Sequence, residues 1–182
     1  MEFVKINEKL EMGKYLVTQL EWIKIMNTNP SYFPKKELSL YPVDSVSWFD
    51  AQDFLISFNL KQKDNYLYKL PTSAEWLLAA EAENNLYPWG NKFDPNKCNI
   101  ESREPTPITK YSNGTSPYGC YDMMGNLWEW CQNWYDNDQS YKILRGGSWD
   151  SYQANARCAF RYDQPSERDA GVGFRVARVK RG

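Results

Sequence analysis

The chain has 182 residues, of which 42% are hydrophobic and 16% aromatic, and it carries a formal net charge of -1. A chain of this size and composition can bury a hydrophobic core, so we expect one domain over residues 1–182. The near-neutral charge and the lack of a long basic run argue against the clustered Lys and Arg of a nucleic-acid-binding protein.

The sequence also lacks the features of membrane-spanning segments, secretory signal peptides and histidine-dependent sites. No apolar run reaches about 18 residues, so we expect no membrane span. The first residues, MEFVKINEKL, lack the apolar core of a secretory signal peptide. Histidine is absent, which excludes Ser-His and Cys-His nucleophile pairs and His-ligated metal sites.

Four cysteines occur without the C-x-x-C spacing of a zinc ribbon: Cys98, Cys120, Cys131 and Cys158. One disulfide, with Cys131 and Cys158 as candidates, is one interpretation. Buried free thiols are the other.

Three capping boxes predict three short helices in the first half of the chain. In each box a Ser or Thr side chain accepts from an amide of the first turn, and an acidic side chain three positions later reaches back. The boxes are Thr18 to Glu21, Ser47 to Asp50 and Thr72 to Glu75. The second helix is expected to end near Asn59 and to bury a stripe at helical spacing, formed by Ala51, Phe54, Leu55 and Phe58.

After about Leu86 the chain is rich in Pro, Gly, Asn and aromatic residues, which predicts long ordered loops with short strands. Trp128 and Trp130 alternate after a Gly125-Asn126 turn, which predicts a strand whose tryptophans pack in the core. Otherwise only ILRGG and VGFRVARV, near the C-terminus, have the composition of good strands.

Seven motifs occur in a fixed order along the chain: MGKYLVT, PVDSVSWFDAQDF, YKLPTSAEW, YPWGN, YGCYDMMGNLWEW, ILRGGSW and VGFRVAR. Together they resemble the formylglycine-generating enzyme family, also called the sulfatase-modifying factor family, across nearly the whole chain. The resemblance implies an α+β, C-type-lectin-like fold of the formylglycine-generating-enzyme subtype, with much irregular structure, short strands and peripheral helices.

The copper site of the family's enzymes is not expected here. Those enzymes resemble one another in two cysteines after the GGS motif, which bind copper and oxidise a substrate cysteine with oxygen; thiolates suit Cu(I). Counted from Trp149, the corresponding positions are Ser151 and Ala156. Cys158 matches a structural cysteine of the family, and the related iron-dependent branch needs histidines. We therefore predict no copper and no catalysis by either route.

The resemblance also implies a structural calcium site within YDMMGNLWEW. Asp122 and Glu129 would supply carboxylate oxygens, and Gly125 and Leu127 stand where the family offers backbone carbonyls to the ion. The alternative is that Asp122 and Glu129 cap turns or form hydrogen bonds in the core.

In framework and loop size the chain is similar to one branch of this fold, the variable proteins of diversity-generating retroelements. In them, mutagenesis at adenines rewrites AAY asparagine codons on the ligand-binding face. Over about 149–172, Gln153, Gln164 and Glu167 cannot arise from AAY. The residues that can arise from it are Asp150, Ser151, Tyr152, Asn155, Phe160, Tyr162, Asp163, Ser166, Asp169, Ala170 and Gly171.

This composition suits recognition, because aromatic side chains give contact area at low entropic cost and the acids add selectivity. Trp149 belongs to the family pattern, and we expect it to form a wall of the site or part of the core. The alternative is a solvated loop with chance aromatic residues.

Three hypotheses follow. The first is a non-catalytic binding protein, diversified by a retroelement, that recognises a protein or glycan on a cell surface; viral receptor binding or surface display, with location on a virion or a cell surface, would fit. The second is a divergent formylglycine-type oxidase acting on a cysteine or small thiol. The third is an inactive accessory domain of an enzyme partner. The sequence indicates neither the ligand nor the oligomeric state.

Overall fold

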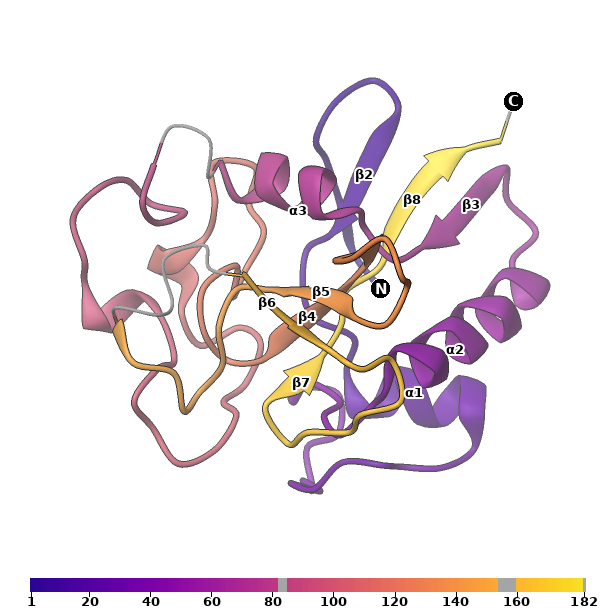
Figure 1. Ribbon diagram of the computed structural model, residues 1–182, viewed down its shortest axis with the longest axis horizontal. Coiled ribbons are helices and arrows are strands. Elements are labelled where there is room, and N and C mark those ends of the chain that lie inside the picture. The colour runs from indigo at the N-terminus through magenta and orange to yellow at the C-terminus, as the bar shows by residue number, and fades with distance from the viewer. Residues whose placement is uncertain (82–84, 154–159, 182) are drawn as a thin grey trace.

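Two small sheets form the centre of the computed structural model, which describes residues 1–81, 85–153 and 160–181 (Figure 1). The first sheet has the order β1-β2-β8-β3 and the second the order β6-β5-β4-β7. The strands are β1 (Phe3–Lys5), β2 (Leu10–Gly13), β3 (Tyr66–Lys69), β4 (Trp128–Trp134), β5 (Lys142–Arg145), β6 (Phe160–Asp163), β7 (Val172–Gly173) and β8 (Ala177–Lys180).

Three α-helices begin where the capping boxes predict them. They are α1 (Gln19–Met26), α2 (Trp48–Lys61) and α3 (Ser73–Ala80), and both hydrogen bonds of each capping box are formed. The helix α2 continues two residues beyond the expected Asn59, whose side chain donates to the carbonyl oxygens of Leu55 and Tyr68. Two 3-10 turns follow, η1 (Pro95–Lys97) and η2 (Ser112–Gly114).

The main core lies where α1 and α2 pack against the sheets (Figure 1). Phe54 of α2 is fully buried, stacks on Trp22 at a ring-centroid distance of 5.4 Å, and meets Phe174 edge-on at 5.4 Å. Trp128 and Trp130 of β4 belong to the same core, as expected. The expected helical stripe is therefore buried, with Phe58 at its edge.

The expectation of one strand over VGFRVARV is wrong. Its first part is β7, which pairs in parallel with β4, and its last part is β8, which pairs with β2 and β3 in the other sheet. Between these two strands Arg175 is fully buried, and its guanidinium donates to the carbonyl oxygens of Gly13 and Tyr121.

Of the four cysteines, Cys98, Cys120 and Cys131 are buried free thiols, so the free-thiol interpretation is the one that the structure supports for them. Cys158 lies outside the described residues. Burial raises the pKa of the Cys98 thiol to about 12 and also raises the pKa of Cys131. These thiols are therefore protonated and unreactive near neutral pH.

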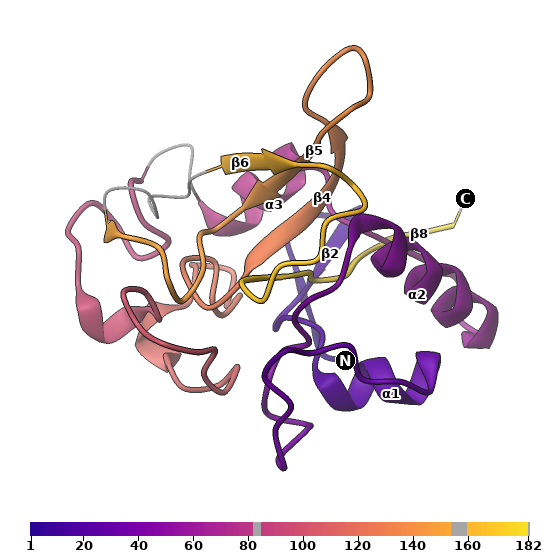
Figure 2. The same ribbon diagram turned by 60° about the horizontal axis from the view of Figure 1, so that its bottom comes forward.

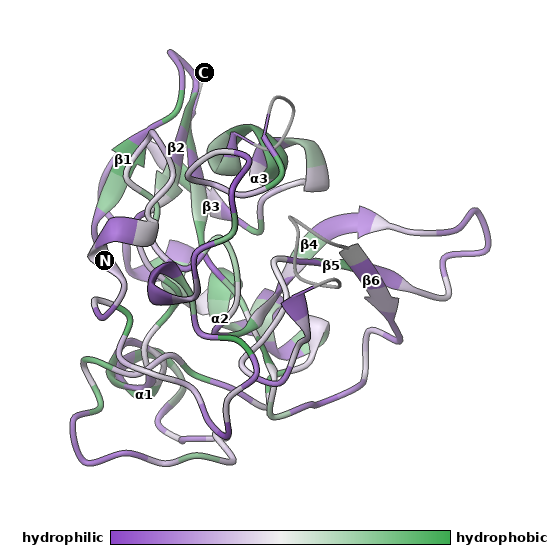
Figure 3. Cartoon of the chain, turned by 90° about the vertical axis from the view of Figure 1, so that its left-hand side faces the viewer, coloured by the Kyte–Doolittle hydropathy of each residue, from purple (hydrophilic) through white to green (hydrophobic). Residues whose placement is uncertain are grey.

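The turn between β4 and β5 projects from the body of the molecule (Figures 2 and 3). At its base the Lys142 ammonium is buried, lies over the rings of Trp134 and Trp48 at 3.5 and 3.9 Å, and donates to the Gln132 carbonyl oxygen. Burial lowers the pKa of Lys142 to about 8.

Among the described helices, none is both long and apolar enough to cross a membrane.

Candidate binding surface

The segment from Trp149 to Gly171 is fixed at both ends to one short stretch of framework. The Trp149 amide donates to the Asn126 carbonyl oxygen at 3.0 Å, and the Trp128 amide donates to the Gly171 carbonyl oxygen at 2.8 Å. Both ends of the candidate segment are therefore attached to the same three-residue stretch of framework, residues 126–128. The distance between the two ends does not depend on the side chains that lie between them.

Most of the described candidate residues reach solvent. Tyr152 has 70% of its surface exposed, and Asp150, Tyr162, Ser166 and Asp169 are also exposed. Trp149, Ser151, Asp163 and Ala170 are half-buried. Asn155 lies outside the described residues, as does the side chain of Phe160, although Phe160 begins β6.

Asp169, Ala170 and Gly171 form a structured turn. Asp169 accepts from the Gly171 amide at 2.7 Å through one carboxylate oxygen and from Arg161 at 3.2 Å through the other. Gly171 is buried, and a Cβ at this position would lie 3.2 Å from the Ser148 hydroxyl oxygen. Gly171 thus shapes the backbone beneath the surface and presents no side chain to a ligand.

One flank of the surface consists of framework tyrosines on the β4–β5 hairpin. Tyr162 of β6 stacks on Tyr135 with ring centroids 4.0 Å apart and meets Tyr141 edge-on at 5.3 Å. Tyr135 and Tyr162 are both exposed. Tyr162 thus joins the candidate segment to Tyr135 and Tyr141 of the hairpin, whose projection Figure 2 shows. No pattern in the sequence predicts that this hairpin borders the candidate segment.

A second flank comes from the chain between α1 and α2. Phe33 meets the Trp149 ring edge-on at a centroid distance of 5.6 Å, and the exposed Tyr32 meets Phe33 edge-on at 5.0 Å. Trp149 also donates through its indole nitrogen to the Ala170 carbonyl oxygen. Trp149 therefore lies between the candidate segment and this flank, and it also packs against the core cluster formed by Leu16, Ile108 and Leu127.

Ser151 is held by its neighbours. Its hydroxyl accepts from the Ser148 amide at 3.0 Å, and its carbonyl oxygen accepts from the Glu101 amide at 3.1 Å. Ala156 lies outside the described residues. A hydroxyl and a methyl group cannot replace the two thiolates that Cu(I) prefers.

The residues implied as calcium ligands lie in the buried segment that follows η2, and they differ in how they are partnered. Asp122 is buried, and none of the described residues donates a hydrogen bond to its Oδ1, which suits a cation. Burial raises the pKa of Asp122 to about 7, against a hydrogen bond from Asn126. Gly125 and Leu127, which lie between Asp122 and Glu129 in the sequence, are both buried, and Gly125 has a φ of 79°.

Glu129 already has a counter-ion. Both of its oxygens accept from the buried Arg175 guanidinium, at 2.6 and 2.7 Å, and one of them also accepts from the Trp76 indole at 2.8 Å. Glu129 thus forms the hydrogen bonds in the core that were the alternative to calcium binding. Asp122 is the residue of the implied set whose oxygen fits a metal ion.

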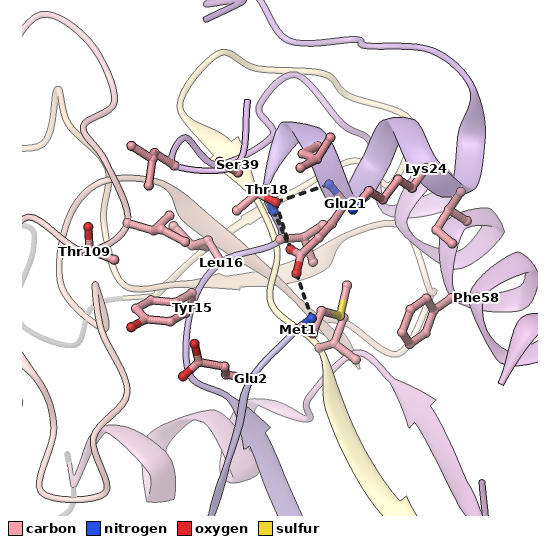
Figure 4. Close-up of a pocket in the computed structure, with 17 residues that line it drawn as sticks. Met1, Glu2, Tyr15, Leu16, Thr18, Glu21, Lys24, Ser39, Phe58 and Thr109 are labelled. Atoms are coloured by element: carbon pink, nitrogen blue, oxygen red, sulfur yellow. Dashed lines mark hydrogen bonds and ion pairs between the residues drawn. The ribbon is translucent and has the colours of Figure 1, made fainter. Parts of the chain in front are cut away.

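A pocket of about 510 Å³ lies where β2 and α1 meet the chain around Ile108 (Figure 4). Tyr15, Leu16 and Phe58 contribute much of its apolar wall, and Glu21 stands at one side with an oxygen bound to Thr18. None of the described residues of the candidate segment lines it.

Comparison with known proteins places this geometry in a family. The chain is 32% identical over 158 residues to the "Serine/threonine-protein kinase pkn1" of Chlamydia caviae, covering 76% of this chain and 24% of that protein. It is 35% identical over 158 residues to the "Inactive C-alpha-formylglycine-generating enzyme 2" of Bos taurus, covering 75% and 50%. The chain therefore spans half or less of the length of these two relatives.

Among solved structures, the fold is similar to that of the "Treponema denticola variable protein 1", with a TM-score of 0.76 and 23% identity over 97% of this chain and 91% of that one. The fold is C-type-lectin-like, of the formylglycine-generating-enzyme subtype. A family model described as a sulfatase-modifying factor enzyme 1-like domain matches residues 2–180. The chain belongs to this family of sulfatase-modifying factor, or formylglycine-generating-enzyme, domains.

Proposed function

We propose that this chain is a non-catalytic ligand-binding protein, diversified by a retroelement, which recognises a protein or glycan on a cell surface through the residues of 149–172. The observation that carries the proposal is the exposed set of aromatic and acidic side chains on a segment that is fixed at both ends. Such side chains give recognition with little conformational cost. Location on a virion or a cell surface fits this role.

Two comparisons support the proposal. One solved structure with a similar fold is named a variable protein. The Bos taurus relative is named inactive, and Ser151 stands in this chain where a copper-binding enzyme of the family needs a thiolate.

The diversification is tested at the gene. We expect a near-copy of codons 145 to 175 close by, with adenines where the two copies differ, beside a reverse-transcriptase gene. A neighbourhood without these elements would refute diversification and leave ligand binding to be tested separately.

The binding role is tested with the variants Tyr152→Ala and Tyr162→Ala, which remove exposed rings. Truncation of a central contact residue costs 2 kcal/mol or more in typical protein interfaces, or roughly 30-fold in affinity. We expect at least one variant to lose cell-surface binding to about this extent while keeping the melting temperature of the unmodified protein. Unchanged binding by both variants would refute the surface.

One observation favours a second candidate, an accessory domain of an enzyme partner. The matched region makes up 24% of a relative that is named a protein kinase, so a domain of this family occurs within a longer chain. If this candidate is correct, the gene of this chain encodes or adjoins an enzyme rather than a reverse transcriptase.

The proposal also includes a structural calcium ion at Asp122. The support is the buried Asp122 oxygen without a partner, because Ca²⁺ prefers carboxylate and carbonyl oxygens. A ligand that binds the native state raises its melting temperature. We expect the midpoint to be higher in calcium than in chelator, and to be the same in both for Asp122→Asn. An unchanged midpoint in the unmodified protein would assign Asp122 a purely structural role.

A further inference from the structure

The loop from Asn29 to Lys35, called here the 29–35 loop, is held by a buried glutamine that uses its whole hydrogen-bonding capacity. The Gln19 amide nitrogen donates to the carbonyl oxygens of Phe33 and Pro42, at 3.0 and 3.2 Å. Its oxygen accepts from the Asn29 side chain at 3.1 Å and the Lys35 amide at 3.2 Å. A glutamine can form four such bonds, and Gln19, which is 1% exposed, forms all of them.

A buried acid holds the centre of the same loop. Asp44, fully buried, accepts from the Tyr32 amide at 2.6 Å, and its own amide donates to the Ser31 hydroxyl at 3.2 Å. Its Oδ2 accepts no hydrogen bond from any residue that the structure describes. Ser45, next in the chain, has a φ of 59° and donates its amide to the Asp169 carbonyl oxygen. One short segment therefore supports both the 29–35 loop and the Asp169 turn.

This arrangement is costly and presents an exposed side chain. A fully buried carboxyl group and a non-glycine residue at positive φ both reduce stability, and such features concentrate where function requires them. The side chain that they position, Tyr32, is 72% exposed. Because the Tyr32 ring is exposed in the isolated chain, its burial does not offset the lost stability there.

We infer that the 29–35 loop is a constant half of the ligand surface, that Tyr32 is its contact residue, and that the partner is a folded protein. The inference rests on the proposed function and deepens it. Phe33 against Trp149 makes the loop continuous with the candidate segment. The 29–35 loop lies outside 149–172, so retroelement mutagenesis leaves Tyr32 in place while the segment beside it changes.

The composition of the surface favours a protein over a small sugar. Protein interfaces are rich in tyrosine and tryptophan. Tyr32, Tyr152 and Tyr162 are exposed. Phe33 and Trp149 connect Tyr32 to the candidate segment.

The test measures binding of the fluorescently labelled full chain to a panel of intact bacterial strains by flow cytometry. Tyr32→Ala is compared with Leu60→Ala, which removes an 83% exposed side chain in the last turn of α2. Leu60 lies about 18 Å along the helix from Trp48, whose amide donates to the Pro165 carbonyl oxygen. Cells are also treated with proteinase K or with periodate, which removes protein or glycan ligands respectively.

We expect Tyr32→Ala to weaken binding about 10-fold or more, Leu60→Ala to leave it unchanged, and proteinase K to abolish it. Tyr152→Ala and Tyr162→Ala report on the proposed function in the same assay. If one of these two loses binding while Tyr32→Ala keeps it, the inference is overturned and the proposed function stands. Binding that is removed by periodate and resists proteinase K overturns the protein partner alone.

Two further comparisons test the proposed function as a whole and the role of Asp44. If no strain is bound in a saturable way, or if both candidate-segment variants bind normally, the proposed function fails and the inference fails with it. Asp44→Ala, which removes the acceptor of the Tyr32 amide, is expected to weaken binding, whereas Asp44→Asn keeps an acceptor oxygen and retains binding. Equal binding by these two variants would contradict the role of Asp44 in positioning Tyr32.

Discussion

At the scale of single residues, the ion pair between Glu129 and Arg175 holds the two sheets to each other. Glu129 lies in β4 of the second sheet, and Arg175 lies where the chain passes to β8 of the first. Both side chains are fully buried. A buried ion pair contributes little net stability compared with apolar residues, but removal of one partner leaves the other charge uncompensated in the interior.

We therefore expect Glu129→Gln to lower the free energy of unfolding by about 3–5 kcal/mol. The matched control is Glu11→Gln, which breaks a two-point hydrogen-bonded pair with Arg178 whose side chains are partly exposed. Partly exposed pairs contribute about 0–1 kcal/mol. Urea unfolding of both variants measures the difference, and similar losses in the two would contradict the importance of burial.

Asp44 gives a prediction for pH. Burial is the largest influence on its carboxyl and raises the pKa in the folded chain above the ordinary 3.8, against hydrogen bonds from Ser45 and Tyr32. The folded state therefore binds the proton more tightly than the unfolded state, and this group's contribution to stability falls as pH rises from 3.8 through the raised pKa. Above that window the full cost of the buried charge is present.

The variant Asp44→Asn removes this cost and keeps an acceptor for the Tyr32 amide. We expect it to unfold at higher urea concentration than the unmodified protein near neutral pH, and to converge with it at acidic pH. Urea midpoints across the pH range measure this. A constant difference at all pH values would show that Asp44 ionisation does not affect stability.

At the scale of elements, the helices were predictable because their signals are local. A capping box is formed by four consecutive positions, and its two hydrogen bonds do not depend on the rest of the fold. The boxes at Thr18, Ser47 and Thr72 are all formed. The end of α2 is predicted two residues early at Asn59, whereas the C-cap is Gln62. The Asn59 side chain is accommodated within the helix because it donates to the carbonyl oxygens of Leu55 and, in β3, of Tyr68.

The Thr72 box permits a direct measurement of one such signal. We expect Thr72→Ala to lower the free energy of unfolding by about 1 kcal/mol, because the Glu75 amide loses its acceptor. Thr72→Ser keeps the hydroxyl and should cost less. If the two substitutions cost the same, packing of the threonine methyl group, rather than capping, stabilises the start of α3.

The strands and the flanks of the surface were harder to predict. β1, β2 and β3 are three or four residues long, too short for an alternating pattern to be distinctive, and their pairing joins opposite ends of the chain. The roles of Tyr32 and Tyr135 depend on contacts with Trp149 and Tyr162 that only the folded chain creates. The residues that can arise from AAY codons predict which positions vary, but they do not predict which constant residues border them.

At the scale of the whole molecule, the fold of an enzyme family is present while the residues of its copper chemistry are replaced. We expect the purified protein to bind no stoichiometric Cu(I) and to consume no oxygen with a cysteine-containing peptide, since neither Ser151 nor Ala156 can supply a thiolate. An active formylglycine-generating enzyme assayed in parallel is the control. Copper-dependent oxygen uptake by this chain would favour the oxidase hypothesis.

The attachment of both ends of the candidate segment to Asn126 and Trp128 has a practical consequence for protein engineering. Trp149 and Gly171 keep their anchoring bonds through backbone atoms, so these bonds are independent of the side chains installed between them. The segment can therefore serve as an exchangeable cassette in a synthetic library. Randomisation should spare Gly171, where a Cβ would lie 3.2 Å from the Ser148 hydroxyl oxygen and would require that side chain to shift.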